Sequence, residues 1–423
     1  MHIIHDVNGL HGILPRHLTG RVRQALRTFP VVVLSGARQT GKSTLIRRLL
    51  GDPGRLYRTM DEMDTLDAAR RDPDALIGSK RPLALDEIQR SPELLLAIKR
   101  AVDRDRRPGR FLLSGSANLT LLRKVSETLA GRAMYLTLHP FTVAEREGRG
   151  TAGRWDILLS DPGRLEGDHP RLEGLDKEIR TSGFPPAALA RSRGRRDDWL
   201  AGYVQTYIER DLQTLSEIHN LADFRRLLRL VALRSGGLMN QSHMARDAGL
   251  PQPTVHRYLN LMEVSYMLHR LEPYSVSRSR RLVRSPKLFM CDSGLAAHLA
   301  GVAIPGGHSD PVFRGSLLET LVLNDLLAWR EGSGRKPEIL FWRTAAGAEV
   351  DFVVEMEGRI WPVEVKAAGR AGPRDTGHIR LFMGEYGKAV PHGIILHAGS
   401  RAERIGSRIW AVPLSAAFGL SEA

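Results

Sequence analysis

The feature that most constrains the fold of this chain is residues 31–50, which spell VVVLSGARQTGKSTLIRRLL. Four β-branched or apolar residues predict a strand, a glycine-containing loop follows, and the next residues predict a helix. The loop from Gly36 to Ser43 matches the pattern G-x-x-x-x-G-K-[ST], in which backbone N–H groups surround phosphate oxygens where a Cβ would collide. The helix behind it offers an N-terminus that favours anions. This context predicts a phosphate-binding loop rather than a glycine turn that only connects two elements.

The residue types in the loop suggest a role for each position. We expect Lys42 to place its charge on the β- and γ-phosphate oxygens, and the Ser43 hydroxyl to ligate Mg²⁺. ATP and Mg²⁺ are therefore the expected ligands. The predicted nucleotide-binding residues are Gly36, Ala37, Arg38, Gln39, Thr40, Gly41, Lys42, Ser43 and Thr44.

A second half of the nucleotide site is expected where an apolar strand ends in Asp86 and Glu87. Asp86 can hold the Mg²⁺ shell, and Glu87 can orient or deprotonate the attacking water; capping of the following helix is the alternative. The strand FLLSGSA brings Ser116 to a place where its side chain could touch the γ-phosphate or the water. Arg132 is a candidate for stabilising transition-state charge across a subunit boundary, with a surface arginine in a turn as an equal alternative.

Strand and helix signals alternate through the first part of the chain, which indicates a parallel sheet flanked by helices. Residues 145–175 are rich in Gly, Pro and charge and are expected to form a loop or insertion. The pattern is helical from about 195 to 270, and β-rich runs return from 338 to 397. The predicted strands of the first sheet are 31–35, 55–60, 83–87 and 111–115.

Composition and charge narrow the classes of partner. The 62 Lys and Arg outnumber the 47 Asp and Glu, and the net charge of +15 favours a polyanion, with nucleic acid before an anionic membrane. An arginine-rich composition of no special purpose would give the same balance. No stretch has the roughly 20 uninterrupted apolar residues of a membrane span, and the first residues lack the pattern of a secretory signal. The single cysteine, Cys291, cannot form an internal disulfide, which fits a reducing cytoplasm.

Residues 240–262 predict a helix-turn-helix. Asn240 is expected to cap a helix over 241–248, Gly249 to end it, and a second helix to begin near Pro253. Helical spacing turns Val255, Tyr258, Leu259 and Met262 toward the core. The residues left to face a DNA groove are Gln252, Thr254, His256 and Arg257, and a basic hairpin after them adds Arg278, Arg280 and Arg281. A protein–protein module is the alternative.

Polar residues also interrupt apolar segments after residue 310. Glu319 lies in a leucine-rich helical stretch, Asp351 opens a strand, and Glu364 and Lys366 alternate with valines. Residues two apart on a strand share a face, so Glu364 and Lys366 point together, and a hairpin would bring Asp351 close. Two acids and a lysine suit a Mg²⁺-dependent cut of a phosphodiester. The alternative is a cross-strand ion pair.

With these residues assembled, the chain resembles a prokaryotic family of AAA-superfamily ATPases whose C-terminal part is a domain of unknown function. The resemblance covers nearly the whole chain and rests on segments that include GARQTGKSTL, LALDEIQRSPELL, ETLAGRA, YIERDL, FRGSLLETLVLNDL, RTAAGAEVDFVVE and PVEVKA. It implies a winged-helix middle and a C-terminal fold similar to PD-(D/E)xK nucleases. The nuclease-like signature of the family maps onto Glu319, Asp351, Glu364 and Lys366.

The expected fold class is α/β in three parts: an AAA-type P-loop ATPase domain over 1–195, a helical lid and winged helix over 196–290, and a restriction-endonuclease-like domain over 291–423. We expect a cytoplasmic, homo-oligomeric, Mg²⁺-dependent ATPase that binds and remodels DNA, with branched DNA as one option and no membrane partner. Whether the C-terminal site cuts or only binds stays open. The alternatives are a nucleotide-switched DNA-binding regulator and a protein-remodelling ATPase.

Overall fold

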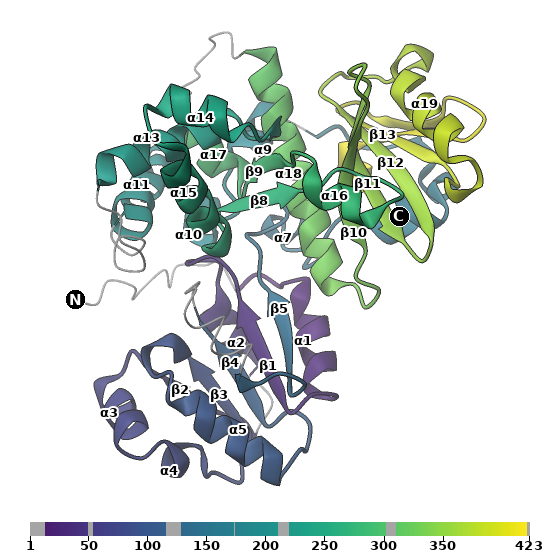
Figure 1. The fold of residues 1–423 in the computed structure, drawn as a ribbon. Coiled ribbons are helices and arrows are strands. Elements are labelled where there is room, and N and C mark those ends of the chain that lie inside the picture. Colours follow the sequence, from purple (N-terminus) through teal and green to yellow (C-terminus); the bar gives the residue numbers. More distant parts are fainter. Residues whose placement is uncertain are drawn as a thin grey trace.

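The computed structural model describes residues 13–49, 54–115, 128–172, 174–209, 220–301 and 310–420. Figure 1 shows a lower lobe built on the first sheet. Above it, the helical middle and the C-terminal sheet lie on either side of the long helix α18 (Pro311–Gly332). That helix also reaches the first sheet, where the Thr137 N–H donates to Glu331 Oε2 at 3.2 Å.

The first sheet has five parallel strands in the order β2-β3-β4-β1-β5. An all-parallel sheet needs cover on both faces, and alternate residues supply it: Val31 and Val33 face one core, whereas Val32 and Leu34 face another. The predicted helix-flanked parallel sheet is therefore confirmed. Its strands are β1 (Val31–Ser35), β2 (Leu56–Thr59), β3 (Leu83–Asp86), β4 (Phe111–Ser114) and β5 (Ala133–Thr137). The first core includes α3 (Met63–Arg71), α4 (Pro73–Ile77) and α5 (Leu94–Arg104), and the second includes α1 (Leu18–Leu26) and α2 (Lys42–Leu49).

The chain leaves the first sheet after β5 and joins the upper part of the molecule. Of the two expectations for 145–175, a loop or an insertion, the loop is wrong, because Trp155, Leu158 and Leu165 are buried in the large upper core. The segment ends in β6, the edge strand of the C-terminal sheet. The first sheet thus ends well before residue 195, the predicted end of the first domain. The elements between β5 and residue 190 are α7 (Val143–Arg146), α8 (Trp155–Ser160), β6 (Gly167–Asp168), α9 (Leu175–Arg180) and α10 (Pro185–Ala188).

The middle part combines helices with a small sheet in the order β7-β9-β8. Helix α14 (Gln241–Ala248) begins and ends where predicted: the Asn240 side chain accepts from the His243 N–H, and Gly249 has a φ of 63°. The predicted core residues of α15 (Gln252–Val264) are all buried. The remaining elements are α11 (Arg193–Tyr203), a π-helical stretch (Val204–Glu209), α13 (Leu221–Leu233), β7 (Gly237–Leu238), β8 (Leu268–Leu271), β9 (Lys287–Met290) and α17 (Ser293–Leu299).

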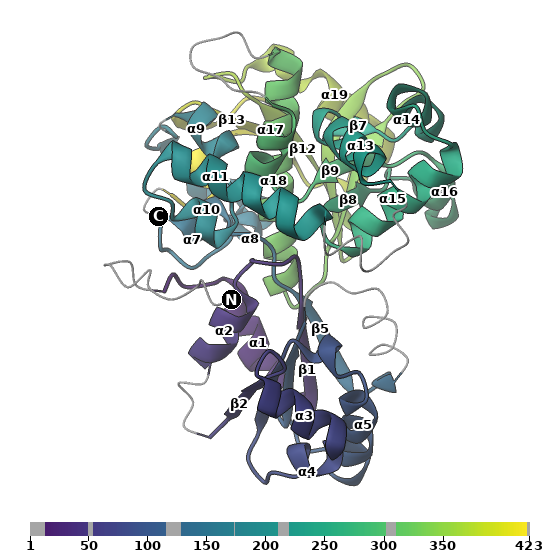
Figure 2. The ribbon, with the colours of Figure 1, turned by 90° about the vertical axis from the view of Figure 1, so that its left-hand side faces the viewer.

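The connection between β8 and β9 is more than the expected basic hairpin. The two strands pair antiparallel, but the connection forms α16 (Arg278–Val283) and docks on the C-terminal sheet. There the Phe341 N–H donates to the Glu272 carbonyl at 3.1 Å, and the Tyr274 N–H donates to the Phe341 carbonyl. Figure 2 shows α14, α15 and α16 on one side of the molecule.

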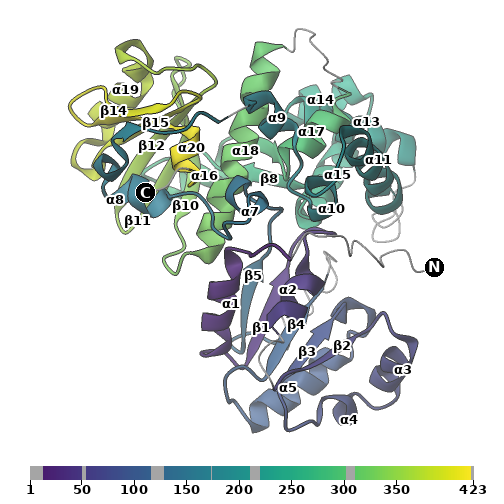
Figure 3. The same cartoon turned by 180° about the vertical axis from the view of Figure 1, so that it is seen from behind.

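The C-terminal sheet has seven strands in the order β10-β11-β12-β13-β15-β14-β6. Helix α18 packs on one face, and α19 (Gly377–Tyr386) packs on the other against Val353 and Ile395. Figure 3 shows this sheet from behind. No helix among the described residues has the length and apolar character of a membrane span. The bounds are β10 (Glu338–Arg343), β11 (Glu349–Met356), β12 (Arg359–Lys366), β13 (Gly393–His397), β14 (Arg401–Arg404), β15 (Ile409–Pro413) and α20 (Leu414–Ala417).

A buried carboxylate fastens the segment after β5 to α18. Asp325 Oδ1 accepts from the Trp155 indole N–H at 2.6 Å and from the Gly153 N–H at 2.8 Å. We expect Asp325→Ala to lower the free energy of unfolding by about 2–4 kcal/mol, because it leaves two buried donors without an acceptor. Urea denaturation measures this, with Asp198→Ala on the exposed face of α11 as the control. Equal losses in the two variants would contradict the role given to Asp325.

Candidate nucleotide site and C-terminal acid cluster

The phosphate-binding loop lies at the carboxyl edge of the first sheet, between β1 and α2. Gly36 has a φ of 137°, and a Cβ there would collide with the backbone oxygen of Leu138. Gly41 has a φ of 94°, so both conserved positions of the pattern need glycine for a conformational reason. The loop has the predicted strand-loop-helix context.

Lys42 folds back on its own loop. Its ammonium donates to the Ala37 carbonyl at 2.8 Å and to the Gly36 carbonyl at 3.1 Å. Burial lowers the pKa of Lys42 to about 8, against the opposite effect of Glu87 and Asp86. Lys42 is therefore still mainly protonated at neutral pH, and phosphate oxygens would give this buried cation stronger partners than two carbonyls.

The back of the loop is held by Arg16, a residue that the sequence does not single out. Its guanidinium donates to the Thr40 carbonyl at 2.7 Å and to the His139 carbonyl at 2.6 Å, and it pairs with Glu145 at 3.1 Å. Thr40 is buried and bonds within the loop, whereas Arg38 and Gln39 are exposed. The loop is thus fixed on its inner side and open on its outer side.

Asp86 and Glu87 stand at the same edge of the sheet, at the end of β3. Asp86 is buried, accepts from the Tyr57 hydroxyl at 2.8 Å and from the Glu87 N–H at 3.1 Å, and bonds the Ser114 hydroxyl. Glu87 adopts a left-handed conformation with a φ of 54°. Such strain in a non-glycine residue is a feature of functional sites. Burial and the neighbouring Asp86 raise the pKa of Glu87, which suits a group that takes up a proton.

The loop and β3 fit ATP and Mg²⁺ in the way that the sequence predicts. The cradle formed by Gly36 has no room for a side chain, and Lys42 is a buried cation directed into it. Ser43 at the start of α2 and Asp86 at the end of β3 are the residues that would hold Mg²⁺, which usually keeps several waters and takes only one or two protein ligands.

Two predicted catalytic residues do not join this site. Ser116 lies outside the described residues, as do the side chains of the YIERDL segment. Arg132 precedes β5, whose residue Ala133 pairs with Val31 at the opposite end of β1 from the loop. It forms a two-bond ion pair with Asp103, with Nε to Oδ1 at 2.7 Å and Nη2 to Oδ2 at 3.1 Å. Within one chain, Arg132 is therefore on the far edge of the sheet from the nucleotide loop.

Two tyrosines of the middle part reach the nucleotide loop and the end of the strand before it. The Tyr203 hydroxyl donates to the Arg38 carbonyl at 3.3 Å, and the Tyr266 hydroxyl donates to Ser35 Oγ at 2.9 Å. Tyr266 directly follows α15 and has a φ of 57°. The contact of Tyr266 therefore connects the end of β1, just before the loop, with the chain that follows α15.

The predicted DNA-contacting residues fall into exposed and buried groups. On α15, Gln252, His256 and Arg257 are exposed and Thr254 is half-buried, and on α16 Arg278 and Arg280 are exposed. Arg281 does not fit the predicted DNA contact. Its side chain is buried, it pairs with Glu338 at 2.7 Å and Glu355 at 2.6 Å, and it stacks over Tyr274. A guanidinium with two carboxylate partners anchors α16 to the C-terminal sheet instead.

The four nuclease-like residues lie around one point between α18, β11 and β12. Asp351 Oδ2 accepts from the Val365 N–H at 2.7 Å, and the Lys366 ammonium donates to Glu364 Oε1 at 2.8 Å. Two further residues join that the sequence does not single out. Lys287 of β9 is 3.5 Å from Glu319 Oε2 and also pairs with Glu349. Glu349 could have been predicted from the sequence, because it lies two residues before Asp351 on the same strand and therefore shares its face. Nothing in the local sequence points to Lys287.

Six charges thus share one buried region, which we call the acid cluster: Glu319, Glu349, Asp351, Glu364, Lys287 and Lys366. Burial, and then Asp351, raise the pKa of Glu319 and of Glu364 to about 8 in each case. Burial alone would lower the pKa of Lys287, but its carboxylate neighbours outweigh it and raise the value. Since like charges this close cannot all ionise, the raised pKa of Glu319 and of Glu364 makes these two acids the ones that take up protons most readily.

The acid cluster does not fit a preformed metal centre. Among the described residues, no group of three or more His, Cys, Asp or Glu side chains is arranged to hold a metal ion. Lys287 supplies a positive charge to Glu319 and Glu349, and Lys366 supplies one to Glu364. The alternative interpretation, a network of ion pairs inside a sheet, accounts for these contacts.

The pH dependence of stability tests the buried state of Glu364. Because its folded pKa of about 8 lies above the value of about 4.3 for an unfolded glutamate, the folded chain binds more protons between these values. Stability that is present below pH 4.3 is therefore lost as the pH rises toward 8. As the pH is raised from 5 to 8, we expect the free energy of unfolding of Glu364→Gln to increase by about 2–4 kcal/mol relative to that of the wild type. Urea denaturation in EDTA at the two pH values measures it, and an equal difference at both would contradict the shift.

Comparison with known protein families divides the chain into three matches. Residues 28–147 match an AAA domain, residues 172–304 match a domain of unknown function (DUF8612), and residues 314–417 match a second domain of unknown function (DUF4143). The AAA match covers β1 to α7 and contains the loop, Asp86 and Glu87. The winged-helix and nuclease-like assignments stay predictions.

Among solved structures, a Walker-type ATPase of Pyrococcus abyssi is 15% identical, with a TM-score of 0.45 over 69% of this chain and 99% of that chain. A RuvB variant of Thermotoga maritima is 20% identical, with a TM-score of 0.29 over 60% and 88%. Both likenesses are too distant to carry an argument.

Two sequence relatives are much more similar. They are the uncharacterized proteins Rv2008c of Mycobacterium tuberculosis and Mb2031c of Mycobacterium bovis, each 33% identical over 353 residues, which are 83% of this chain and 73% of the relative. Within this chain, the AAA match contains the nucleotide loop and the acidic end of β3. The chain therefore belongs to the same family as these two mycobacterial proteins, a family with an AAA-superfamily P-loop domain.

Proposed function

We propose that this protein is a Mg²⁺-dependent ATPase that binds DNA and remodels it as a homo-oligomer. The observation that carries this proposal is a pair of tyrosine contacts from the middle part, Tyr203 to Arg38 in the nucleotide loop and Tyr266 to Ser35 just before it. Through these contacts, a change in the nucleotide site could alter the position of α11 and of the end of α15, the second helix of the helix-turn-helix.

Lys42, Asp86 and Glu87 of the nucleotide site support a hydrolytic mechanism. When ATP and Mg²⁺ are bound, the metal neutralises charge on the β- and γ-phosphates. Lys42 leaves the carbonyls of Gly36 and Ala37 for phosphate oxygens. Glu87, whose pKa is raised by burial and by Asp86, orients the attacking water and accepts its proton.

The DNA part rests on α15, α16 and the charge of the chain. Helix α15 exposes Gln252, His256 and Arg257, and the net charge of +15 favours a polyanion. His256 lies between Gln241 and Asn260, at 3.3 Å and 3.0 Å from its ring nitrogens. These residues form a polar surface that can hydrogen-bond to base edges, as the winged-helix interpretation requires.

The place of Arg132 is what supports the homo-oligomer in this proposal. Because it stands on the far edge of the sheet from its own loop, it can stabilise the transition state only in a neighbouring subunit. The exposed pair with Asp103 is weak enough to exchange for a phosphate. A surface ion pair within one subunit is the alternative.

The rate of ATP hydrolysis with and without DNA tests the proposal. We expect duplex, single-stranded or four-way DNA to raise the wild-type rate several-fold, and Glu87→Gln to abolish turnover. Tyr266→Phe removes one hydroxyl that is not part of the nucleotide site, so it should keep the basal rate within about twofold and lose most of the stimulation, since a neutral hydrogen bond contributes about 1 kcal/mol.

Flat rates on every DNA, with basal hydrolysis intact, would point to a protein-remodelling ATPase. A response to DNA that survives in Glu87→Gln would point to a nucleotide-switched regulator.

Cutting by the acid cluster is a separate prediction. Because Lys287 and Lys366 pair with three of its four acids, we expect the cluster to bind without cutting. Incubation of branched and linear DNA with the wild type, Asp351→Ala and Lys366→Ala in Mg²⁺ or Mn²⁺ tests this. Cleavage by the wild type that is lost in both variants would show that the cluster is a nuclease after all.

A further inference from the structure

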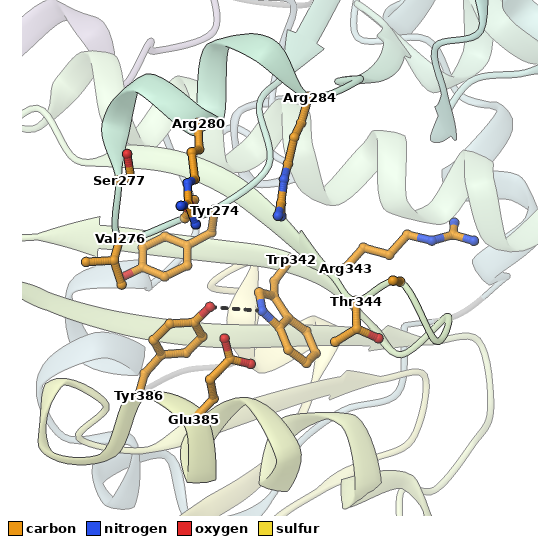
Figure 4. Close-up of a pocket in the computed structure, with 12 residues that line it drawn as sticks. Tyr274, Val276, Ser277, Arg280, Arg284, Trp342, Arg343, Thr344, Glu385 and Tyr386 are labelled. Atoms are coloured by element: carbon orange, nitrogen blue, oxygen red, sulfur yellow. Dashed lines mark hydrogen bonds between the residues drawn. The ribbon is translucent and has the colours of Figure 1, made fainter.

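We propose that a groove between α16, the end of β10 and the end of α19 binds an unpaired DNA strand. The groove has a volume of about 510 Å³, and Figure 4 shows the side chains that line it. This inference rests on the proposed DNA-binding function and specifies which form of DNA is held and where.

The groove has a fixed wall because α16 is firmly docked. Arg281 donates to the Ser275 carbonyl at 2.7 Å and pairs with Glu338 and Glu355. The strand-like contacts of Tyr274 with Phe341 add backbone bonds. The segment that carries the exposed arginines is therefore held against the C-terminal sheet before any ligand arrives, which lowers the entropy cost of binding.

The α16 side of the groove is positively charged and available. Figure 4 shows Arg280 and Arg284 directed from α16 toward the strand that carries Trp342. Both side chains are exposed, and within the described ranges neither guanidinium has a carboxylate partner. In contrast, Arg343 on the opposite side is paired with Glu349 at 3.0 Å. Two unpaired guanidiniums next to each other are suited to consecutive phosphates.

The floor of the groove is aromatic. The Trp342 indole N–H donates to the Tyr386 hydroxyl at 3.2 Å, and the Tyr274 and Tyr386 rings meet edge to face at 5.1 Å. Tyr274 and Trp342 are buried, whereas Tyr386 is half-buried, so the exposed part of the Tyr386 side chain is the aromatic surface that a base could contact. Glu385 on the same rim would repel phosphate but can accept from a base amino group. The phosphates therefore belong on the α16 side and the bases on the α19 side.

The surroundings favour one strand over a duplex. A volume of this size matches a pocket for a small ligand, so it can take one or two nucleotides but not a double helix. Two large apolar side chains of the same segment are exposed, Val276 at 75% and Leu282 at 79%. Apolar side chains beside arginines are a means of unstacking bases. Together these features suit DNA at a junction, where a strand leaves its duplex.

Fluorescence anisotropy of the full chain with a labelled oligo-dT of about 15 nucleotides tests this site. We expect Arg280→Glu with Arg284→Glu to weaken binding at least tenfold and to reduce the slope of log Kd against log salt by about 1.4, for two phosphate contacts. The control is Arg70→Glu with Arg104→Glu, which makes the same change in net charge on exposed residues of the lower lobe. This double variant should weaken binding less than threefold. Tyr386→Ala should weaken binding about fivefold or more, whereas Tyr386→Phe should not.

The outcomes separate this site from the proposed function. If the wild type binds no DNA of any form, the DNA-binding function itself fails. If the wild type binds DNA but the two double variants weaken the oligo-dT complex equally, DNA binding stands and the groove is not its site. Competition by poly-glutamate as strong as that by oligo-dT would overturn the assignment to nucleic acid in favour of an acidic peptide.

Discussion

The buried guanidinium of Arg16 is the interaction on which the nucleotide site depends. A charge out of water is stable only when it is paired and hydrogen-bonded. Arg16 meets this condition through the Thr40 carbonyl, the His139 carbonyl and Glu145 together. The nucleotide loop, the end of β5 and α7 are therefore held in one arrangement. The inner side of the loop is held by this buried pair, whereas its outer side is contacted by Tyr203 of the middle part.

The acid cluster applies the same constraint at the other end of the molecule, with a different result. Lys287 comes from the small sheet of the middle part, and the carboxylates come from α18, β11 and β12. Each part would bury an unbalanced charge if the other were removed. The cluster is thus as much a joint between the middle and C-terminal parts as a candidate reaction site, and burial raises the pKa of Glu319 and of Glu364 within it.

The sequence predicts most of what depends on neighbours along the chain. The strand-loop-helix at 31–50, the cap at Asn240, the left-handed Gly249 and the buried stripe on α15 all lie where local patterns indicate. Local patterns did not predict the structure of 145–175. Its glycines and charged residues indicate a loop, whereas three of its large apolar residues are buried against distant segments in the large upper core. The basic run at 278–284 was similarly ambiguous: composition groups Arg280 with Arg281, whereas packing exposes one and buries the other between Glu338 and Glu355.

The sequence by itself determined that the chain has a phosphate-binding loop, an acidic strand end and a capped pair of helices, because each of these needs only residues within a few turns or one strand. Only the tertiary structure decided which charges neutralise one another and which remain available. Lys287 meets Glu319, and Arg132 meets Asp103 on the far edge of the sheet, since pairing and burial depend on segments that are distant in the chain. Coulomb energy between such groups changes with both separation and solvent access, and no local pattern records either.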